Sequence, residues 1–394
     1  MNHFRHWMLD PEIVFLNHGS FGACPSPVLE AQRAYQERME REPVRFFIRE
    51  APELLADARR ELGRFIGASP DDLAFVPNAT TGVNAVLRSL PLTAGDELIV
   101  TNHEYNASRN VLDYVASENG ARVVEVLVPF PLASADQIVE AVLRAVTTNT
   151  RLALLDHVTS STALVLPLQE IIRELEARGV AVLVDGAHAP GMLDLDMGTL
   201  AASYYTGNCH KWMCAPKGAG FLWARADRRD SVRPAVISHG ANAPVSKRER
   251  FRAEFDWMGT DDPSAIFAVP EAIRFMGKLL PGGWAEVRSR NHALAVEGSR
   301  IIADAFDVET PCPEAMLGSI ASVPLPATER FPPPHTGSEL SQDPVHDVLF
   351  DKHRIEVPIL RNPVDSGRLV RLSAQLYNQR ADYEKLADAL AAIL

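Results

Sequence analysis

Apolar runs alternate with helical patterns through the first 225 residues of this chain. The runs expected as strands are 71–76, 96–101, 121–128, 151–156, 181–185, 203–207 and 218–225. Helical periodicity fills several of the intervals, at 80–90, 135–146 and 168–179. Unbroken Val and Leu runs are typical of strands that are buried on both faces of a parallel sheet. The alternation therefore predicts an α/β fold with a mainly parallel sheet covered by helices.

The pattern changes after about residue 260, where long helical stretches begin. A short helix is expected near 345–354, strands at 355–360 and 368–375, and a final helix at 381–394. A Pro-rich polar loop at 327–344 interrupts this part of the chain. The pattern predicts a smaller C-terminal α+β domain beside the large α/β domain.

Charge and cysteine usage exclude several classes of function. The formal net charge is −12 over 394 residues, which does not favour a nucleic-acid partner. No apolar segment is long enough to span a bilayer, so no membrane partner is expected. The four cysteines form no CxxC pair and no His/Cys cluster with metal spacing, which predicts no metal site and no disulfide framework. A reducing, cytoplasmic location is the expectation.

Polar side chains follow five of the expected strands. They are Asn78, Thr80 and Thr81, then Glu104, Tyr105 and Asn106, then His157, Thr159 and Ser160, then Asp185 and His188, and finally Asn208, His210 and Lys211. Any single one could be an ordinary loop residue or a helix cap. Because ligands bind at the carboxyl ends of strands in open α/β sheets, the whole set predicts one shared site.

The residue types in this set indicate a particular chemistry. The helix that starts at Ala79, Thr80 and Thr81 suits a phosphate group. Asp185 directly follows an apolar strand, and a buried carboxylate there requires a cationic partner. A lysine in such a pocket, here Lys211, can act as a nucleophile toward an aldehyde. Phosphate, cationic ring nitrogen and aldehyde together predict pyridoxal 5′-phosphate as the cofactor.

Motifs along almost the whole chain resemble those of the class V aminotransferase-like pyridoxal-phosphate enzymes of fold type I. The resemblance is closest to the isopenicillin N epimerase-like branch, which also includes C–S lyases of the ergothioneine pathway. The motifs are FLNHGSFG (15–22), NATTGVN (78–84), HEYNASR (103–109), HVTSSTALVLPL (157–168), VLVDGAHAPG (182–191), GNCHKW (207–212), GTDDPSAI (259–266), HRIEVPI (353–359) and VRLSAQLYN (370–378). The resemblance implies a seven-stranded-type sheet. It divides the chain into a segment that lines the active site (1–25), a large cofactor-binding domain (26–265) and a small C-terminal domain (266–394).

The resemblance also implies roles around the cofactor ring. Lys211 matches the Schiff-base lysine, which is then free to act as general base at the substrate α-carbon. Asp185 matches the partner of the pyridinium nitrogen, and Tyr105 the residue that stacks on the ring. His188 and Ser160 match the positions that contact the phenolic oxygen. A core-histidine role for His188 remains open.

Further roles concern the phosphate, the substrate and the partner subunit. Thr80, Asn208 and His210 match phosphate contacts, and Thr260 matches a residue that reaches the phosphate of a neighbouring subunit, which implies a homodimer with shared sites. Arg371 matches the arginine that binds the substrate α-carboxylate. The positions that line the substrate entrance are Asn17, His18 and Gly19.

The reaction itself stays open at this level. Residues 353–371 contain no cysteine, unlike the cysteine desulfurases of the superfamily, so a nucleophilic cysteine is not expected. Removal of the α-proton can lead to epimerisation, to loss of a β- or γ-substituent, or to transamination. Epimerisation of an amino-acid-type substrate is the first hypothesis. The alternatives are a C–S β-lyase acting on a cysteine conjugate or sulfoxide, and an aminotransferase. A nicotinamide dehydrogenase is disfavoured because no GxGxxG follows the first strand.

Overall fold

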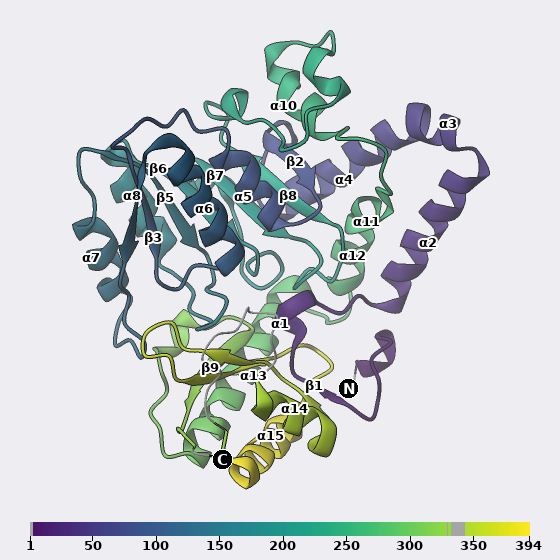
Figure 1. Cartoon of the computed structure of the whole chain (residues 1–394). Helices are drawn as coiled ribbons and strands as arrows, with labels where there is room; N and C mark the ends of the chain where they lie inside the picture. The colour runs from purple at the N-terminus through teal and green to yellow at the C-terminus, as the bar shows by residue number, and fades with distance from the viewer. Residues whose placement is uncertain (1–2, 329, 332–342) are drawn as a thin grey trace.

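The computed structural model describes residues 3–328, 330–331 and 343–394 (Figure 1). A seven-stranded sheet forms its centre, in the order β2-β8-β7-β6-β5-β3-β4. The strands are β2 (Leu73–Val76), β3 (Glu97–Thr101), β4 (Arg122–Val126), β5 (Thr150–Asp156), β6 (Ala181–Gly186), β7 (Tyr204–Asn208) and β8 (Gly220–Ala224). β8 runs opposite to the other six strands of this sheet. The predicted α/β fold with a mainly parallel seven-stranded sheet is confirmed.

Alternating side chains of the strands form two separate apolar cores, one on each face of the sheet. In β6, Leu183 lies in one core while Val182 and Val184 lie in the other. The first core contains α5 (Ala79–Leu87) and α6 (Asn106–Asn119). The second contains α4 (Ala51–Phe65), α7 (Asp136–Arg144) and α8 (Leu168–Ala177). Because both faces are covered, the central strands contain unbroken apolar runs, such as residues 152–155 of β5 and 181–184 of β6, as the sequence indicates.

The C-terminal part is a smaller α+β unit. Its antiparallel sheet has the order β11-β12-β9, from Ile359–Arg361, Arg368–Ser373 and Ile320–Leu325. The helices here are α13 (Gly283–Ala305), α14 (Pro344–His353) and α15 (Arg380–Ile393). Most of the predicted Pro-rich loop at 327–344 lies outside the described residues. The remaining helices are α1 (His18–Phe21), α2 (Ser26–Arg41), α3 (Pro43–Arg45), α9 (Met197–Leu200), α10 (Lys247–Phe255), α11 (Ser264–Phe267) and α12 (Val269–Met276).

The N-terminal segment joins the two parts of the molecule. β1 (Val14–Phe15) pairs in parallel with β10 (Ile355–Glu356) of the C-terminal part. The short helix α1 follows directly and lies between the sheet-containing part and the smaller lower part in Figure 1. The chain therefore brings residues 16–22 to the edge of the sheet where the strands β5, β6 and β7 end. The predicted domain boundaries themselves stay predictions.

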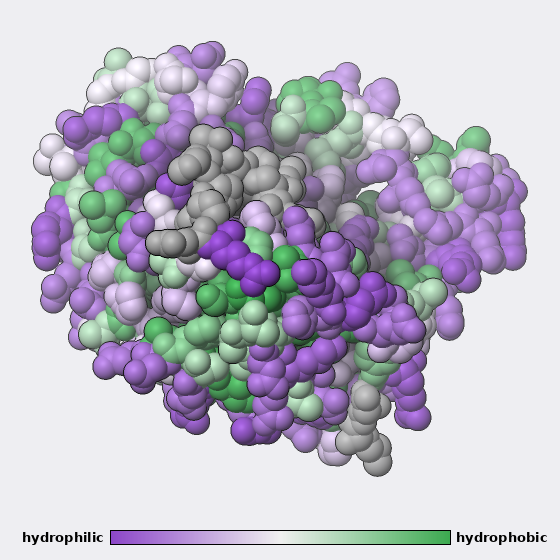
Figure 2. Space-filling view, turned by 60° about the horizontal axis from the view of Figure 1, so that its bottom comes forward, coloured by the Kyte–Doolittle hydropathy of each residue, from purple (hydrophilic) through white to green (hydrophobic). Residues whose placement is uncertain are grey.

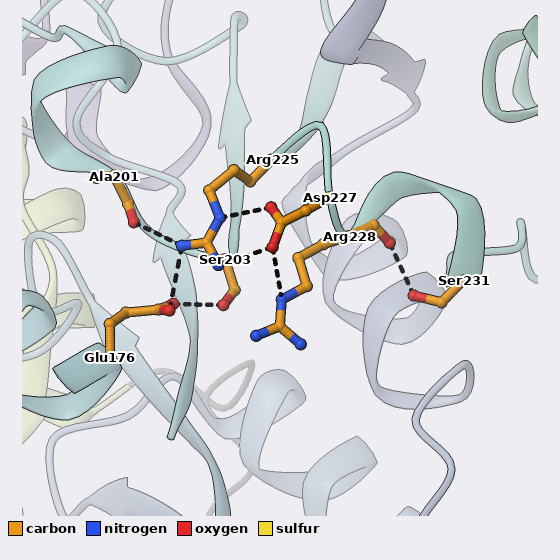
Figure 3. Close-up of polar contacts among 7 residues, drawn as sticks. All are labelled: Glu176, Ala201, Ser203, Arg225, Asp227, Arg228 and Ser231. Carbon is orange, nitrogen blue, oxygen red and sulfur yellow. Dashed lines mark hydrogen bonds and ion pairs between the residues drawn. The ribbon is translucent and has the colours of Figure 1, made fainter. Parts of the chain in front are cut away.

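The opposite edge of the sheet is held by charged residues. Arg225, which follows β8, bonds Glu176, the Ala201 carbonyl and Asp227, and Glu176 also accepts a hydrogen bond from Ser203 (Figure 3). These contacts fix loops on the side away from Lys211.

Figure 2 shows hydrophilic and hydrophobic residues side by side on the face that contains the C-terminal part. Within the described ranges, no helix combines the length and the apolarity needed to cross a bilayer.

Candidate active site

Lys211 lies in the loop between β7 and β8, close to the carboxyl end of β6. Its Nζ is 3.2 Å from Nε2 of His188. The indole N–H of Trp212 donates to Nδ1 of His188 over 3.4 Å, so a neutral His188 carries its proton on Nε2, facing Nζ. Burial lowers the pKa of His188 well below its usual value, which keeps the imidazole neutral. The proton on Nε2 can be donated to Nζ once Lys211 has lost its own proton.

Residues of the N-terminal segment pack closely against the backbone around Lys211. A Cβ on Gly22 would lie 2.0 Å from the His210 carbonyl oxygen, so only glycine allows this approach. His18 donates from Nε2 to the Lys211 carbonyl (3.0 Å), and its Nδ1 is 2.8 Å from the Tyr377 hydroxyl. Burial lowers the pKa of His18 to about 3. His18 is fully buried against the Lys211 backbone, and its predicted role at the substrate entrance stays a prediction.

Asp185 sits in β6 with its carboxylate buried. Oδ2 accepts a hydrogen bond from the Ser108 hydroxyl (2.7 Å) and Oδ1 accepts one from the backbone N–H of Ala187 (3.0 Å). Burial raises the pKa of Asp185 despite these donors and the charge of Lys211. A buried carboxylate served by neutral donors fits a cationic ring nitrogen, which would stabilise its charge. The residues present therefore fit pyridoxal phosphate.

The start of α5 is organised by two asparagines. Asn78 accepts at Oδ1 from the Thr81 N–H (2.9 Å) and hydroxyl (3.1 Å), as a helix N-cap. Asn208 accepts at Oδ1 from the Ala79 N–H (2.8 Å) and so ties the end of β7 to this helix. In the described part of the chain, no group accepts a hydrogen bond from the Thr80 hydroxyl. Of the predicted phosphate contacts at this helix start, Thr80 has the hydroxyl that remains available for an anion.

His210 lies in the loop that follows β7, two residues after Asn208. Its Nδ1 is 3.3 Å from the Ala219 carbonyl, so Nδ1 carries a proton and Nε2 remains for another partner. Burial, with the nearby charge of Lys211, lowers the pKa of His210 to about 4. Without a bound anion, His210 is therefore a neutral imidazole at neutral pH.

Arg371, in β12, is buried and reaches toward the sheet. One terminal nitrogen donates to the Ser160 carbonyl (2.8 Å) and lies 3.3 Å from the Ser160 hydroxyl. The other donates to the Ser20 hydroxyl (2.8 Å), which donates to Asn17 Oδ1 (2.5 Å). Asn17 Nδ2 in turn donates to Glu356 (2.8 Å). The predicted substrate residues Asn17 and Arg371 thus belong to one hydrogen-bonded chain, although Ser160 here faces Arg371.

Three further predicted residues lie at different places. The backbone N–H of Gly19 donates to the Ser373 hydroxyl (3.0 Å), and a Cβ on Gly19 would lie 3.6 Å from the His188 ring. Tyr105 is 37% exposed at the start of α6, and Thr260 is exposed after α10. The roles of Tyr105 at the ring face and of Thr260 toward a neighbouring subunit stay predictions.

Sequence reasoning missed several residues of this site. Ser108 contacts Asp185, Ser20 contacts Arg371 and Trp212 contacts His188. Each stands inside a quoted motif, but nothing in the spacing tells which way its side chain points. Glu104 and Asp156 were visible at strand ends, yet their closeness to Asp185 depends on the strand order.

All four cysteines are buried: Cys24, Cys209, Cys214 and Cys312. Burial raises the pKa of Cys24 and of Cys312 to about 12, and raises the pKa of the other two as well. A thiolate nucleophile is therefore disfavoured at every cysteine, as the sequence predicts.

The fold agrees with solved structures over nearly the whole chain. A variant of C-DES with glycine covalently linked to the PLP cofactor has a TM-score of 0.80 and is 21% identical, covering 99% of both chains. The cystine C–S lyase C-DES with its product cysteine persulfide has a TM-score of 0.78, again at 21% identity, covering 97% of this chain and 98% of that chain. Together with a family match over residues 14–386, this fold defines a pyridoxal-phosphate enzyme of fold type I.

The family follows from the sequence comparisons. The model of aminotransferase class-V matches residues 14–386, and the chain belongs to this family. It is 37% identical to an isopenicillin N epimerase from Amycolatopsis lactamdurans, in a match that covers 97% of this chain and 95% of that protein. It is 34% identical to an isopenicillin N epimerase from Streptomyces clavuligerus, in a match that covers 98% of this chain and 96% of that protein. It is also 34% identical to a probable chloroplastic L-cysteine desulfhydrase from Arabidopsis thaliana, in a match that covers 97% of this chain and 83% of that protein. The predicted family, cofactor and enzyme class are confirmed.

Proposed function

We propose that the enzyme removes the α-proton of an amino-acid-type substrate, with Lys211 both as the attachment point for the cofactor aldehyde and as the base. When bound, pyridoxal phosphate supplies an electron sink for the charge that develops at the α-carbon. The observation that carries the proposal is the 3.2 Å contact between Lys211 Nζ and a neutral His188. His188 orients the amine, and Asp185 keeps the ring nitrogen protonated.

We propose Arg371 as the group that binds the substrate carboxylate. Its guanidinium is held on one side by Ser160 and on the other by Ser20. A fork fixed in this way can meet a carboxylate with little loss of side-chain entropy. Asn17 steadies Ser20 from the N-terminal segment, which therefore contributes to the substrate side of the site.

Epimerisation of an amino-acid-type substrate is the reaction that we propose. Two relatives named isopenicillin N epimerase match the chain along 95% and 96% of their own length. Buried cysteines with raised pKa do not support a route through a protein persulfide. The second candidate is a C–S β-lyase, which the relative named L-cysteine desulfhydrase favours at 34% identity.

Hydrogen exchange separates the two reactions. We expect incubation with the substrate in D₂O to exchange the α-hydrogen and interconvert the two configurations, with no loss of total amino acid. A panel of D- and L-amino acids and cysteine conjugates, followed by NMR and a pyruvate assay, measures both outcomes. Release of pyruvate and ammonia in step with turnover, without configurational change, would replace epimerisation by β-elimination.

If Arg371 binds the substrate carboxylate, its replacement should have a defined kinetic effect. In Arg371→Ala we expect kcat/KM to fall about 10- to 100-fold, mainly through KM, because a charge-assisted contact to the substrate is lost. Arg361→Ala, an exposed arginine in β11, is the matched control and should stay near the wild-type value. An amine substrate without a carboxylate should react equally with wild type and Arg371→Ala. A loss of the same size with that amine would contradict the assignment.

We also propose a homodimer in the cytoplasm. Thr260 is exposed, as a residue that serves a neighbouring subunit must be in a single chain. The four unpaired cysteines suit a reducing compartment. A mass equal to one chain in light scattering, for the cofactor-loaded enzyme, would remove the shared-site part of this proposal.

A further inference from the structure

Three carboxyl groups meet at the edge of the sheet beside the cofactor site. Asp156 ends β5, Asp185 lies in β6 directly opposite it, and Glu104 follows β3. One oxygen of each carboxyl lies within 4.8 Å of the others. Because β3, β5 and β6 are neighbours in the sheet, the strand order itself builds this cluster.

Glu104 receives fewer hydrogen bonds than Asp185 does. Its Oε1 accepts a weak hydrogen bond from the Tyr105 N–H (3.2 Å). Its Oε2 is buried and, within the described residues, has no hydrogen-bond partner. Arg109 is the cation whose charge acts on Glu104, but its guanidinium bonds Asp113 and Glu125. Asp185, in contrast, has two donors, and Lys211 also acts on it.

Three negative charges at this separation, away from water, repel one another strongly. Carboxylates that share a buried site do not all ionise together, and a proton stays with the pair or group. Glu104 Oε2, which no donor among the described residues reaches, can take that proton, because a protonated carboxyl can itself donate. Burial raises the pKa of Glu104 well above the usual carboxyl range, and the charge of Asp185 adds to this effect.

We propose that Glu104 holds a proton beside Asp185 in the cofactor-free enzyme and gives it up when the cofactor binds. The inference rests on the proposed role of Asp185 as partner of the ring nitrogen. If the ring nitrogen arrives protonated, the O–H bond of Glu104 breaks and the proton leaves to solvent. If it arrives unprotonated, the same proton passes to the ring nitrogen. In both cases Glu104 ends as a carboxylate next to a new positive charge.

Calorimetry measures how many protons the enzyme releases or takes up when it binds the cofactor, and this number tests the proposal. The apo-enzyme is titrated with pyridoxal phosphate in two buffers of different ionisation enthalpy, with EDTA present so that no divalent ion occupies the carboxyl cluster. We expect Glu104→Gln to release about one proton fewer, or to take up about one more, than wild type. Glu118→Gln, exposed at the end of α6, is the matched control and should keep the wild-type count. Should Glu104→Gln not fold, Glu104→Met takes its place.

A second readout uses the apo-enzyme alone. Since the folded-state pKa of Glu104 is raised, its stabilising contribution is present at low pH and lost as pH rises. We therefore expect the Tm of Glu104→Gln to rise relative to wild type between about pH 5 and about pH 8. Equal proton counts and a Tm difference independent of pH would overturn this inference alone. Failure of the wild type to bind pyridoxal phosphate would overturn the proposed function, and this inference with it.

Discussion

Replacing Lys211 by alanine should lower kcat by about 10⁴-fold, because attachment of the cofactor and removal of the α-proton both depend on one nitrogen. The structure gives Nζ a neutral imidazole partner in His188 and fixes the backbone through His18. Borohydride reduction of the wild type should join the cofactor to the peptide that contains Lys211, as mass spectrometry would show. In Lys211→Ala that adduct should be absent.

The control for this variant is another lysine. Lys385, exposed in α15, can be replaced by alanine in the same way, with little effect expected on kcat. The unfolding temperature of apo Lys211→Ala should stay close to that of the apo wild type, since the Lys211 carbonyl that His18 binds remains. An adduct at a different residue, or turnover at the wild-type rate, would refute the assignment of Lys211.

The second large effect is expected at Asp185. Asp185→Asn keeps the shape of the side chain but removes the charge opposite the ring nitrogen, so we expect kcat to fall about 10²- to 10³-fold. The absorbance spectrum of the bound cofactor should change with it, as the ring nitrogen loses its proton. Asp388→Asn, exposed in α15, is the matched control.

Stability separates this electrostatic effect from a folding defect. Burial raises the pKa of Asp185 in the folded protein, so the wild-type carboxyl stabilises the fold at low pH and loses that contribution as pH rises. Apo Asp185→Asn should therefore be at least as stable as the apo wild type at neutral pH. A large drop in its Tm, together with an unchanged cofactor spectrum, would argue that Asp185 serves the fold instead of the cofactor.

Much of the fold could be predicted because it depends on local patterns. Apolar runs such as 151–156 and 181–185 occur because both faces of their strands are covered. Such a run can be recognised in the sequence without any knowledge of the tertiary structure. Lys211 and Asp185 could be proposed as site residues as well, because each lies at or just after the carboxyl end of a strand and these ends meet at one edge of a parallel sheet. The chemistry of these two side chains then limits the cofactor.

Other parts of the site depend on distances that no spacing reveals. The sequence does not show that residues 14–22 cross between the two parts of the molecule, which buries His18 against the Lys211 carbonyl. Nor does it show that the Thr81 hydroxyl donates to Asn78. In each case a contact between distant segments, or the choice of one hydrogen-bond partner over another, decided the outcome.

The sequence by itself determined the α/β class, the seven strands and the cofactor, and it proposes Lys211 and Asp185 as the residues that hold this cofactor. These follow from periodicity and from the cost of burying charge, which act residue by residue. Only the tertiary structure brought Glu104, Asp156 and Asp185 within 4.8 Å of one another. It also joined Arg371 to Asn17 through Ser20, across more than 350 residues of chain. The physical reason is that strand order and the path of the N-terminal segment are set by packing of the whole chain, which no local pattern encodes.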